Sequence, residues 1–114
     1  MYVEPKDSRQ RCTKERLFAS FERALQSKAV SDITVSEVCG DAGISRKTFY
    51  KYYSDPFALL LAMQDDLFAG LGQRLAKLPP DVYAISSDII DFVAEHRVVA
   101  KAVFENRGEG NLID

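Results

Sequence analysis

The chain has 114 residues, of which 46% are hydrophobic and 28% are charged, and its formal net charge is −2. This length fits one domain, or one small domain with an appendage, and the composition argues against intrinsic disorder. No apolar run approaches the roughly 18 residues of a membrane-spanning helix, and the N-terminus lacks the apolar stretch of a secretory signal, so we expect no membrane contact. The two cysteines, Cys12 and Cys39, have neither metal-ligand spacing nor a convincing disulfide framework, which predicts a cytoplasmic protein.

Charge is distributed unevenly along the chain. Residues 1–53 carry ten basic and seven acidic side chains, whereas residues 54–114 carry five basic and ten acidic ones. A basic half joined to an acidic half suggests an anionic partner for the first half only. The asymmetry is modest, and an ordinary solvated surface explains it equally well.

The first predicted helix runs from about residue 8 to residue 27. Its apolar residues recur at the spacing of one helical face: Leu17, Phe18, Phe21, Ala24 and Leu25. After a short connector, Thr34 and Glu37 have the spacing of a capping box, which predicts that a second helix begins at Thr34. We expect Val38, Cys39 and Ala42 to face inward from that helix.

Gly43 suits the positive φ that ends a helix, so the second helix is predicted to be short. Ser45, two residues later, is a natural N-cap for a third helix over residues 45–53. That helix must stop before Pro56, because the residue before a proline avoids helical geometry. Asp55 is then placed to cap a fourth helix, with Pro56 in its first turn.

The fourth helix is predicted to reach about Lys77, where Pro79 and Pro80 follow. Residues 81–106 predict one or two further helices, with a break near His96 and Arg97. No segment has the alternation of a strand. The predicted fold is therefore all-α, with three N-terminal helices, a long fourth helix and one or two C-terminal helices.

A helical wheel divides the third helix into two surfaces. Phe49 and Tyr53 fall on one stripe, which we expect to be buried. The opposite surface is basic and hydroxylated, and it contains Lys47, Thr48, Tyr50 and Lys51. Two short helices joined by a tight turn, the second with such a surface, are typical of a helix-turn-helix that binds DNA. On spacing alone, a three-helix core with a solvated lysine face remains equally open.

Residues 33–60, ITVSEVCGDAGISRKTFYKYYSDPFALL, resemble the DNA-binding domain of tetracycline-repressor-type (TetR) transcriptional regulators. The family pattern is T-V-x-x-I-A-x-x-A-G-V-S-x-x-T-x-Y-x-Y/H-F, and the chain follows it in order without gaps from Thr34 to Tyr53. Including the preceding amphipathic helix, the match covers about residues 9–68. Cys39 stands where the family often has alanine, so we interpret it as a structural residue.

The resemblance implies that the chain is a regulator, with repression as the expected mode, and that it binds a double-stranded DNA operator. The implied DNA contacts of the recognition helix are Ser45, Arg46, Lys47, Thr48, Tyr50, Lys51 and Tyr52. Thr34 and Ser36 are expected to contact phosphate at the start of the second helix. Arg9, Arg11 and Lys14 are expected to add backbone contacts. Asp55-Pro56 replaces a family lysine, which removes one implied phosphate contact.

The resemblance also implies a larger helical C-terminal domain with an effector pocket and a dimerising helix pair. We therefore divide the chain into a DNA-binding domain at 8–68 and a short or truncated regulatory and dimerisation region at 69–114. A homodimer paired through the C-terminal half is expected, since that half offers much apolar surface. No residue pattern identifies a small-molecule effector.

Other residues give no sign of catalysis, and we expect no enzyme activity, cofactor or metal. His96 is the only histidine and has no second ligand-type residue nearby, so a surface or capping role is expected. The acids Asp65, Asp66, Asp88, Asp91 and Glu95 are interpreted as solvated. The alternative function is a helical protein-interaction module that has lost DNA binding, favoured by the widely apolar surface of the fourth helix.

Overall fold

The computed structural model describes residues 5–106, with side chains from residue 8 to residue 105. Between residues 5 and 106 the chain is all-α and has no strand, which confirms the predicted fold class. The elements are α1 (Pro5–Leu25), η1 (Val30–Asp32), α2 (Val35–Ala42), α3 (Arg46–Tyr52), α4 (Pro56–Ala76), α5 (Val82–Glu95) and α6 (Arg97–Asn106). Residues 107–114 of the predicted C-terminal region lie outside the described residues.

The chain forms two compact units, Met1–Leu59 and Leu60–Asp114. Helix α4 begins in the first unit and continues through the second. The predicted domain boundary after residue 68 therefore remains a prediction. None of the helices between residues 5 and 106 combines the length and apolar character needed to cross a membrane.

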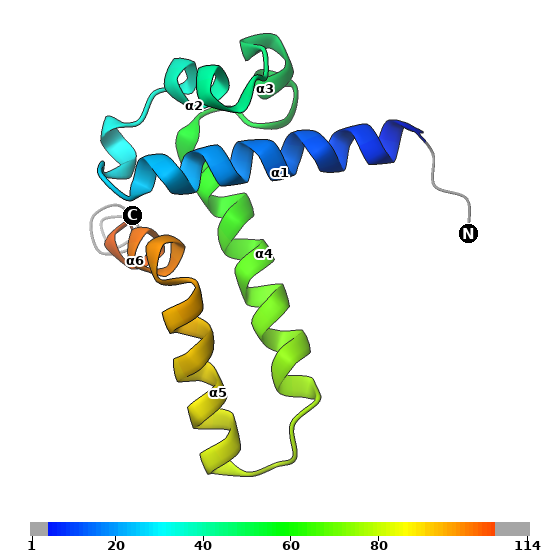
Figure 1. Ribbon diagram of the computed structural model, residues 1–114, viewed down its shortest axis with the longest axis vertical. Coiled ribbons are helices and arrows are strands. Elements are labelled where there is room, and N and C mark those ends of the chain that lie inside the picture. Colours follow the sequence, from blue (N-terminus) through cyan, green and yellow to red (C-terminus); the bar gives the residue numbers. More distant parts are fainter. Residues whose placement is uncertain (1–4, 107–114) are drawn as a thin grey trace. The chain divides into compact units, whose positions relative to one another are not determined.

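In the first unit, α2 and α3 lie on one side of α1 (Figure 1). Leu17 and Phe21 of α1 are completely buried, as the apolar stripe predicts. Ser20, between them, is also buried, and its hydroxyl donates a hydrogen bond of 3.0 Å to the Val38 carbonyl of α2. This bond satisfies the buried Ser20 hydroxyl and ties the two helices together.

The connector between α1 and α2 contains a turn of 3-10 helix that the sequence analysis missed. Val30 and Ile33 are both buried, so this turn contributes to the core. Three-residue helices have no hydrophobic period to detect, and tertiary packing of the two apolar side chains determines this one.

The predicted helix ends are confirmed around α3 and α4. Gly43 has φ of 71° and Ser45 is the N-cap of α3. The Asp55 carboxylate accepts a hydrogen bond of 2.8 Å from the Ala58 backbone N–H, which caps α4 directly before Pro56. Helix α4 ends at Ala76, one residue before the predicted Lys77.

In the second unit, α4 and α5 lie side by side and α6 follows a break at His96 (Figure 1). Arg74 of α4 joins the helices: its Nε lies 2.8 Å from Asp88 Oδ2, and its Nη1 donates to Glu95 Oε1 at 3.0 Å. Glu95 is exposed, as predicted, whereas the prediction that Asp88 is solvated is wrong, because its side chain is only 20% exposed. The Arg74 hydrogen bond holds the pKa of Glu95 below its ordinary value.

Candidate nucleic-acid interface

Short-range hydrogen bonds determine the conformation of the turn between α2 and α3. The Gly43 backbone adopts the left-handed region and its N–H bonds to the Cys39 carbonyl, which ends α2. Ser45 then accepts a hydrogen bond of 3.1 Å from the Thr48 N–H and starts α3. Only residues 43–45 separate the two helices, as a helix-turn-helix requires.

Cys39 is buried, with 4% of its surface exposed, and lies on the inner side of α2. Burial raises the pKa of its thiol, so little reactive thiolate forms near neutral pH. These properties agree with the structural role predicted for Cys39. Ala42, which was expected to face inward, is only half-buried.

Helix α3 presents one buried and one exposed surface. Phe49 is completely buried, whereas Lys47, Tyr50, Lys51 and Tyr52 are exposed. Tyr50 is 56% exposed and its ring meets the Phe49 ring edge-on at 5.5 Å between centroids. This contact with the core fixes the base of the Tyr50 ring and leaves its hydroxyl end outside.

Two positions on α3 differ from the helical wheel. Tyr53 is half-buried rather than fully inside, because it is the C-cap residue with extended backbone and no longer follows the helical period. Thr48 is half-buried, and its Oγ1 accepts a hydrogen bond of 2.9 Å from the Ser45 hydroxyl. Between residues 8 and 105 the Thr48 hydroxyl donates to no other group, so its hydrogen is available to an outside acceptor.

Arg46 and Ser36 come from different helices and are brought together. The Arg46 Nη1 donates to the Ser36 hydroxyl at 3.0 Å, and both residues are exposed. A guanidinium has five N–H donors, so most of them remain free in this arrangement. The contact therefore holds a donor-rich cation at the junction between α2 and α3.

Lys51 extends along its neighbour on α3. Its Nζ lies 5.7 Å from the centroid of the Tyr52 ring, which is 38% exposed. A cation–π contact at the surface is weak. It slightly restricts the motion of the Lys51 side chain, and the ammonium charge stays exposed to solvent. Lys51 and Tyr52 make the C-terminal end of the exposed α3 surface both cationic and aromatic.

Thr34 forms the N-terminal cap of α2. Its hydroxyl accepts the Glu37 backbone N–H at 3.1 Å, and the Glu37 carboxylate accepts the Thr34 N–H at 3.0 Å, which confirms the predicted capping box. The Thr34 hydroxyl also donates to the same carboxylate. A phosphate contact from the Thr34 hydroxyl would require this box to open, whereas the Ser36 hydroxyl accepts from Arg46 and donates to no group of the described residues.

Glu37 also forms an ion pair with Lys28, and this hydrogen bond is the first cause that lowers the pKa of the Glu37 carboxyl. A carboxyl with a lowered native pKa stabilises the fold above the ordinary glutamate value of about 4.3, and that contribution is lost as pH falls through its native pKa. We expect Glu37→Gln to reduce the loss of stability between about pH 5 and pH 3.

Thermal unfolding at several pH values measures this effect. Glutamine still fits a capping box, so the helix start is retained while the titrating charge is removed. Glu15→Gln on α1 is the matched control, because Glu15 is exposed. Equal acid sensitivity in the Glu37→Gln variant and the unmodified chain would contradict the assignment.

Three basic residues of α1 were also expected to contact DNA. Arg9 and Arg11 are exposed, whereas Lys14 is half-buried and its Nζ lies 5.3 Å from the centroid of the Phe18 ring. Residues that sequence reasoning missed include Arg23, which bonds to Asp41 of α2 at 2.6 and 3.0 Å. This hydrogen bond lowers the pKa of Asp41.

An apolar groove in the second unit is the other notable surface. It has a volume of about 230 Å³ and is bordered by Phe68 of α4, Phe92 and Val93 of α5, and Phe104 of α6. His96 lines it as well, and its ring packs on Phe92 at 4.5 Å between centroids. His96 is also the C-cap of α5, as expected. Among the described residues, no cluster of three or more His, Cys, Asp or Glu side chains suits a metal ion.

No family model matches the chain. The HTH-type transcriptional regulator EthR of Mycolicibacterium smegmatis is 33% identical to it over 69 residues, and EthR of Mycobacterium tuberculosis (strain H37Rv) is 39% identical over 68 residues. Each match covers 57% of this chain and 32% of the relative, so the chain spans about a third of the length of these regulators. The predicted resemblance is confirmed: the N-terminal part of the chain is homologous to a TetR-type helix-turn-helix regulator.

Proposed function

We propose, from this homology and from the surface of α3, that the chain is a sequence-specific transcriptional regulator, and specifically a repressor, that binds double-stranded DNA. The observation that carries the proposal is the division of α3, in which Phe49 is buried while Lys47, Tyr50 and Lys51 are exposed. A major groove admits one α-helix with such a surface. The proposed partner is therefore double-stranded DNA in the cytoplasm.

The exposed residues divide by the chemistry they offer. Lys47 and Lys51 neutralise phosphate charge, and the Tyr50 and Tyr52 hydroxyls donate to phosphate oxygens. Ser45, Arg46 and Thr48 lie at the N-terminal end of α3, where a recognition helix approaches base edges. Ser36 supports Arg46 and offers its own hydroxyl hydrogen. Thr34 acts mainly by starting α2.

Selection from a library of random-sequence duplexes tests this function. We expect the chain to enrich one sequence and to bind it more tightly than a shuffled duplex in the same salt, since non-specific binding is mostly electrostatic. A helical interaction module that has lost DNA binding explains the apolar groove but gives α3 no role. Failure to enrich any sequence would favour that module.

We also propose that the regulator is a homodimer paired through its C-terminal half. Two-fold dimers that bind half-sites about 34 Å apart add the contributions of two recognition helices. Phe104 beside the apolar groove is 69% exposed, and Phe68 and Val93 are exposed at the same groove. Such a contiguous apolar patch, with both a groove and a projecting ring, suits an isologous interface.

Sedimentation equilibrium at micromolar concentration tests the dimer. We expect about twice the 12.8 kDa mass of the chain, and a shift toward the monomer in Phe104→Asp. Tyr83→Asp is the matched control, because Tyr83 is 87% exposed and does not line the groove. A monomer that added operator DNA leaves unaltered would contradict the proposal.

A further inference from the structure

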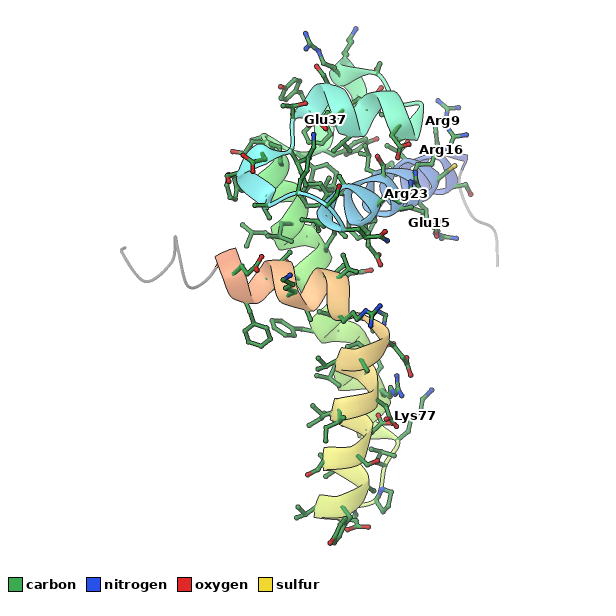
Figure 2. All side chains as sticks on the ribbon, turned by 60° about the vertical axis from the view of Figure 1, so that its left-hand side comes forward. Arg9, Glu15, Arg16, Arg23, Glu37 and Lys77 are labelled. Carbon is green, nitrogen blue, oxygen red and sulfur yellow. The ribbon has the colours of Figure 1, made fainter. Side chains whose placement is uncertain are left out.

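Three arginines lie on one row of α1, at intervals of seven residues: Arg9, Arg16 and Arg23. Seven residues are close to two helical turns, so successive members of the row lie about 10.5 Å apart along the axis and drift by only about 20°. Figure 2 labels all three along the helix, and it shows Glu15 on the opposite edge from Arg9 and Arg16.

The contacts of α1 place this row on the side that carries α2. Ser20 donates to the Val38 carbonyl, and Arg23 bonds to Asp41, so the neighbouring surface of α1 faces α2. Arg9 and Arg16 are exposed and form no ion pair with any side chain that the structure describes between residues 8 and 105. Arg23 therefore has a structural role, whereas Arg9 and Arg16 have no ion-pair partner among the described side chains.

The N-terminal half of α1 extends past α2 and α3 (Figure 1). Arg46 of α3 bonds to Ser36 of α2, and Arg23 of the row bonds to Asp41 of α2, so α2 contacts a cationic side chain from each of its two neighbouring helices. Two guanidinium groups that lie on the α2-facing side of α1, and that pair with no side chain described between residues 8 and 105, suit the phosphates of the duplex that α3 is proposed to bind.

We propose that Arg9 and Arg16 form a second phosphate-binding row, which extends the DNA contact beyond the α2–α3 pair. This inference rests on the proposed function. It changes the expected contacts of α1, because Arg11 lies about 200° around the helix from Arg9, on the side of Glu15. Lys14 is half-buried against Phe18. The proposal assigns to Arg16 the phosphate contact that Arg11 and Lys14 were expected to make.

Fluorescence anisotropy with a duplex selected as above tests the row. We expect Arg9→Ala/Arg16→Ala to weaken binding about tenfold at low salt and to lower the salt slope by about two, one for each lost phosphate contact. The control variant, Lys77→Ala/Lys101→Ala, removes the same charge from two exposed positions outside the row. It should leave the slope within about 0.5 of the unmodified value.

Cys12 offers a second measurement that does not depend on affinity. It is exposed and lies three residues after Arg9 and four before Arg16, which makes it a neighbour of both. Saturating DNA should protect Cys12 from a bulky maleimide, while the buried Cys39 stays unlabelled in either case. A thiol placed at position 15 by Glu15→Cys in a Cys12→Ser background should label equally fast with and without DNA.

The outcomes separate this inference from the proposed function. If Lys47→Ala/Lys51→Ala weakens binding while Arg9→Ala/Arg16→Ala does not, and Cys12 remains unprotected, phosphate binding by the row is excluded. DNA binding by α3 is still supported in that case. If neither double variant alters binding of the duplex, the proposed function itself fails. Circular dichroism melting of each variant verifies that the fold is retained.

Discussion

Phe49→Ala should destabilise the chain by about 3–5 kcal/mol, the usual cost of removing a fully buried phenylalanine. Phe49 has no exposed surface and contacts the rings of Tyr50 and Tyr53, at 5.5 and 5.7 Å between centroids. It is therefore the side chain that anchors α3 to the core. Its loss leaves a cavity and also removes the support of the Tyr50 ring.

Denaturant titration measures this effect. Lys51→Ala is the matched control, because it alters an exposed residue two positions away and should cost under about 0.5 kcal/mol. Equal free-energy changes in the two variants would mean that the surfaces of α3 are assigned the wrong way round. That result would also remove the basis for assigning Lys47 and Lys51 to DNA.

Lys47→Ala/Lys51→Ala should lower affinity for duplex DNA by an order of magnitude or more at low salt. Each lysine that contacts phosphate releases counterions on binding, so the double variant should reduce the salt slope by roughly two. The loss should be similar for the selected and the shuffled duplex, since phosphate contacts carry no sequence information.

Thr48→Val separates contacts with bases from contacts with phosphates. It retains the shape of the side chain and removes the hydroxyl hydrogen that remains free at the N-terminal end of α3. If Thr48 reaches a base edge, this variant should reduce discrimination between the selected and the shuffled duplex while the salt slope is unchanged. Unchanged affinity and slope in the double lysine variant would favour the interaction-module alternative.

Local signals made the helix boundaries predictable. The Thr34–Glu37 capping box, Gly43, Ser45 and the Asp55-Pro56 pair each satisfy backbone groups within a few residues, so sequence spacing alone determines them. The helical wheel likewise placed Phe49 inside and Lys47 and Lys51 outside, because one short regular helix has one period.

Contacts between distant parts of the chain were not predictable in the same way. The bonds from Ser20 to Val38 and from Arg46 to Ser36 join residues 18 and 10 positions apart. The Arg74 pairs with Asp88 and Glu95 depend on how α4 and α5 pack. No periodicity in a single sequence encodes such pairings, although a serine inside the apolar stripe of α1 does signal a buried polar contact.

The most direct test of DNA recognition by α3 is a titration of the isotope-labelled chain with the selected duplex, followed by backbone amide NMR. The proposed function predicts that the largest shifts fall on residues 45–52, with smaller shifts at Ser36 and, if the arginine row binds, at Arg9 and Arg16. Large shifts confined to α5 and α6, with residues 45–52 unchanged, would contradict it.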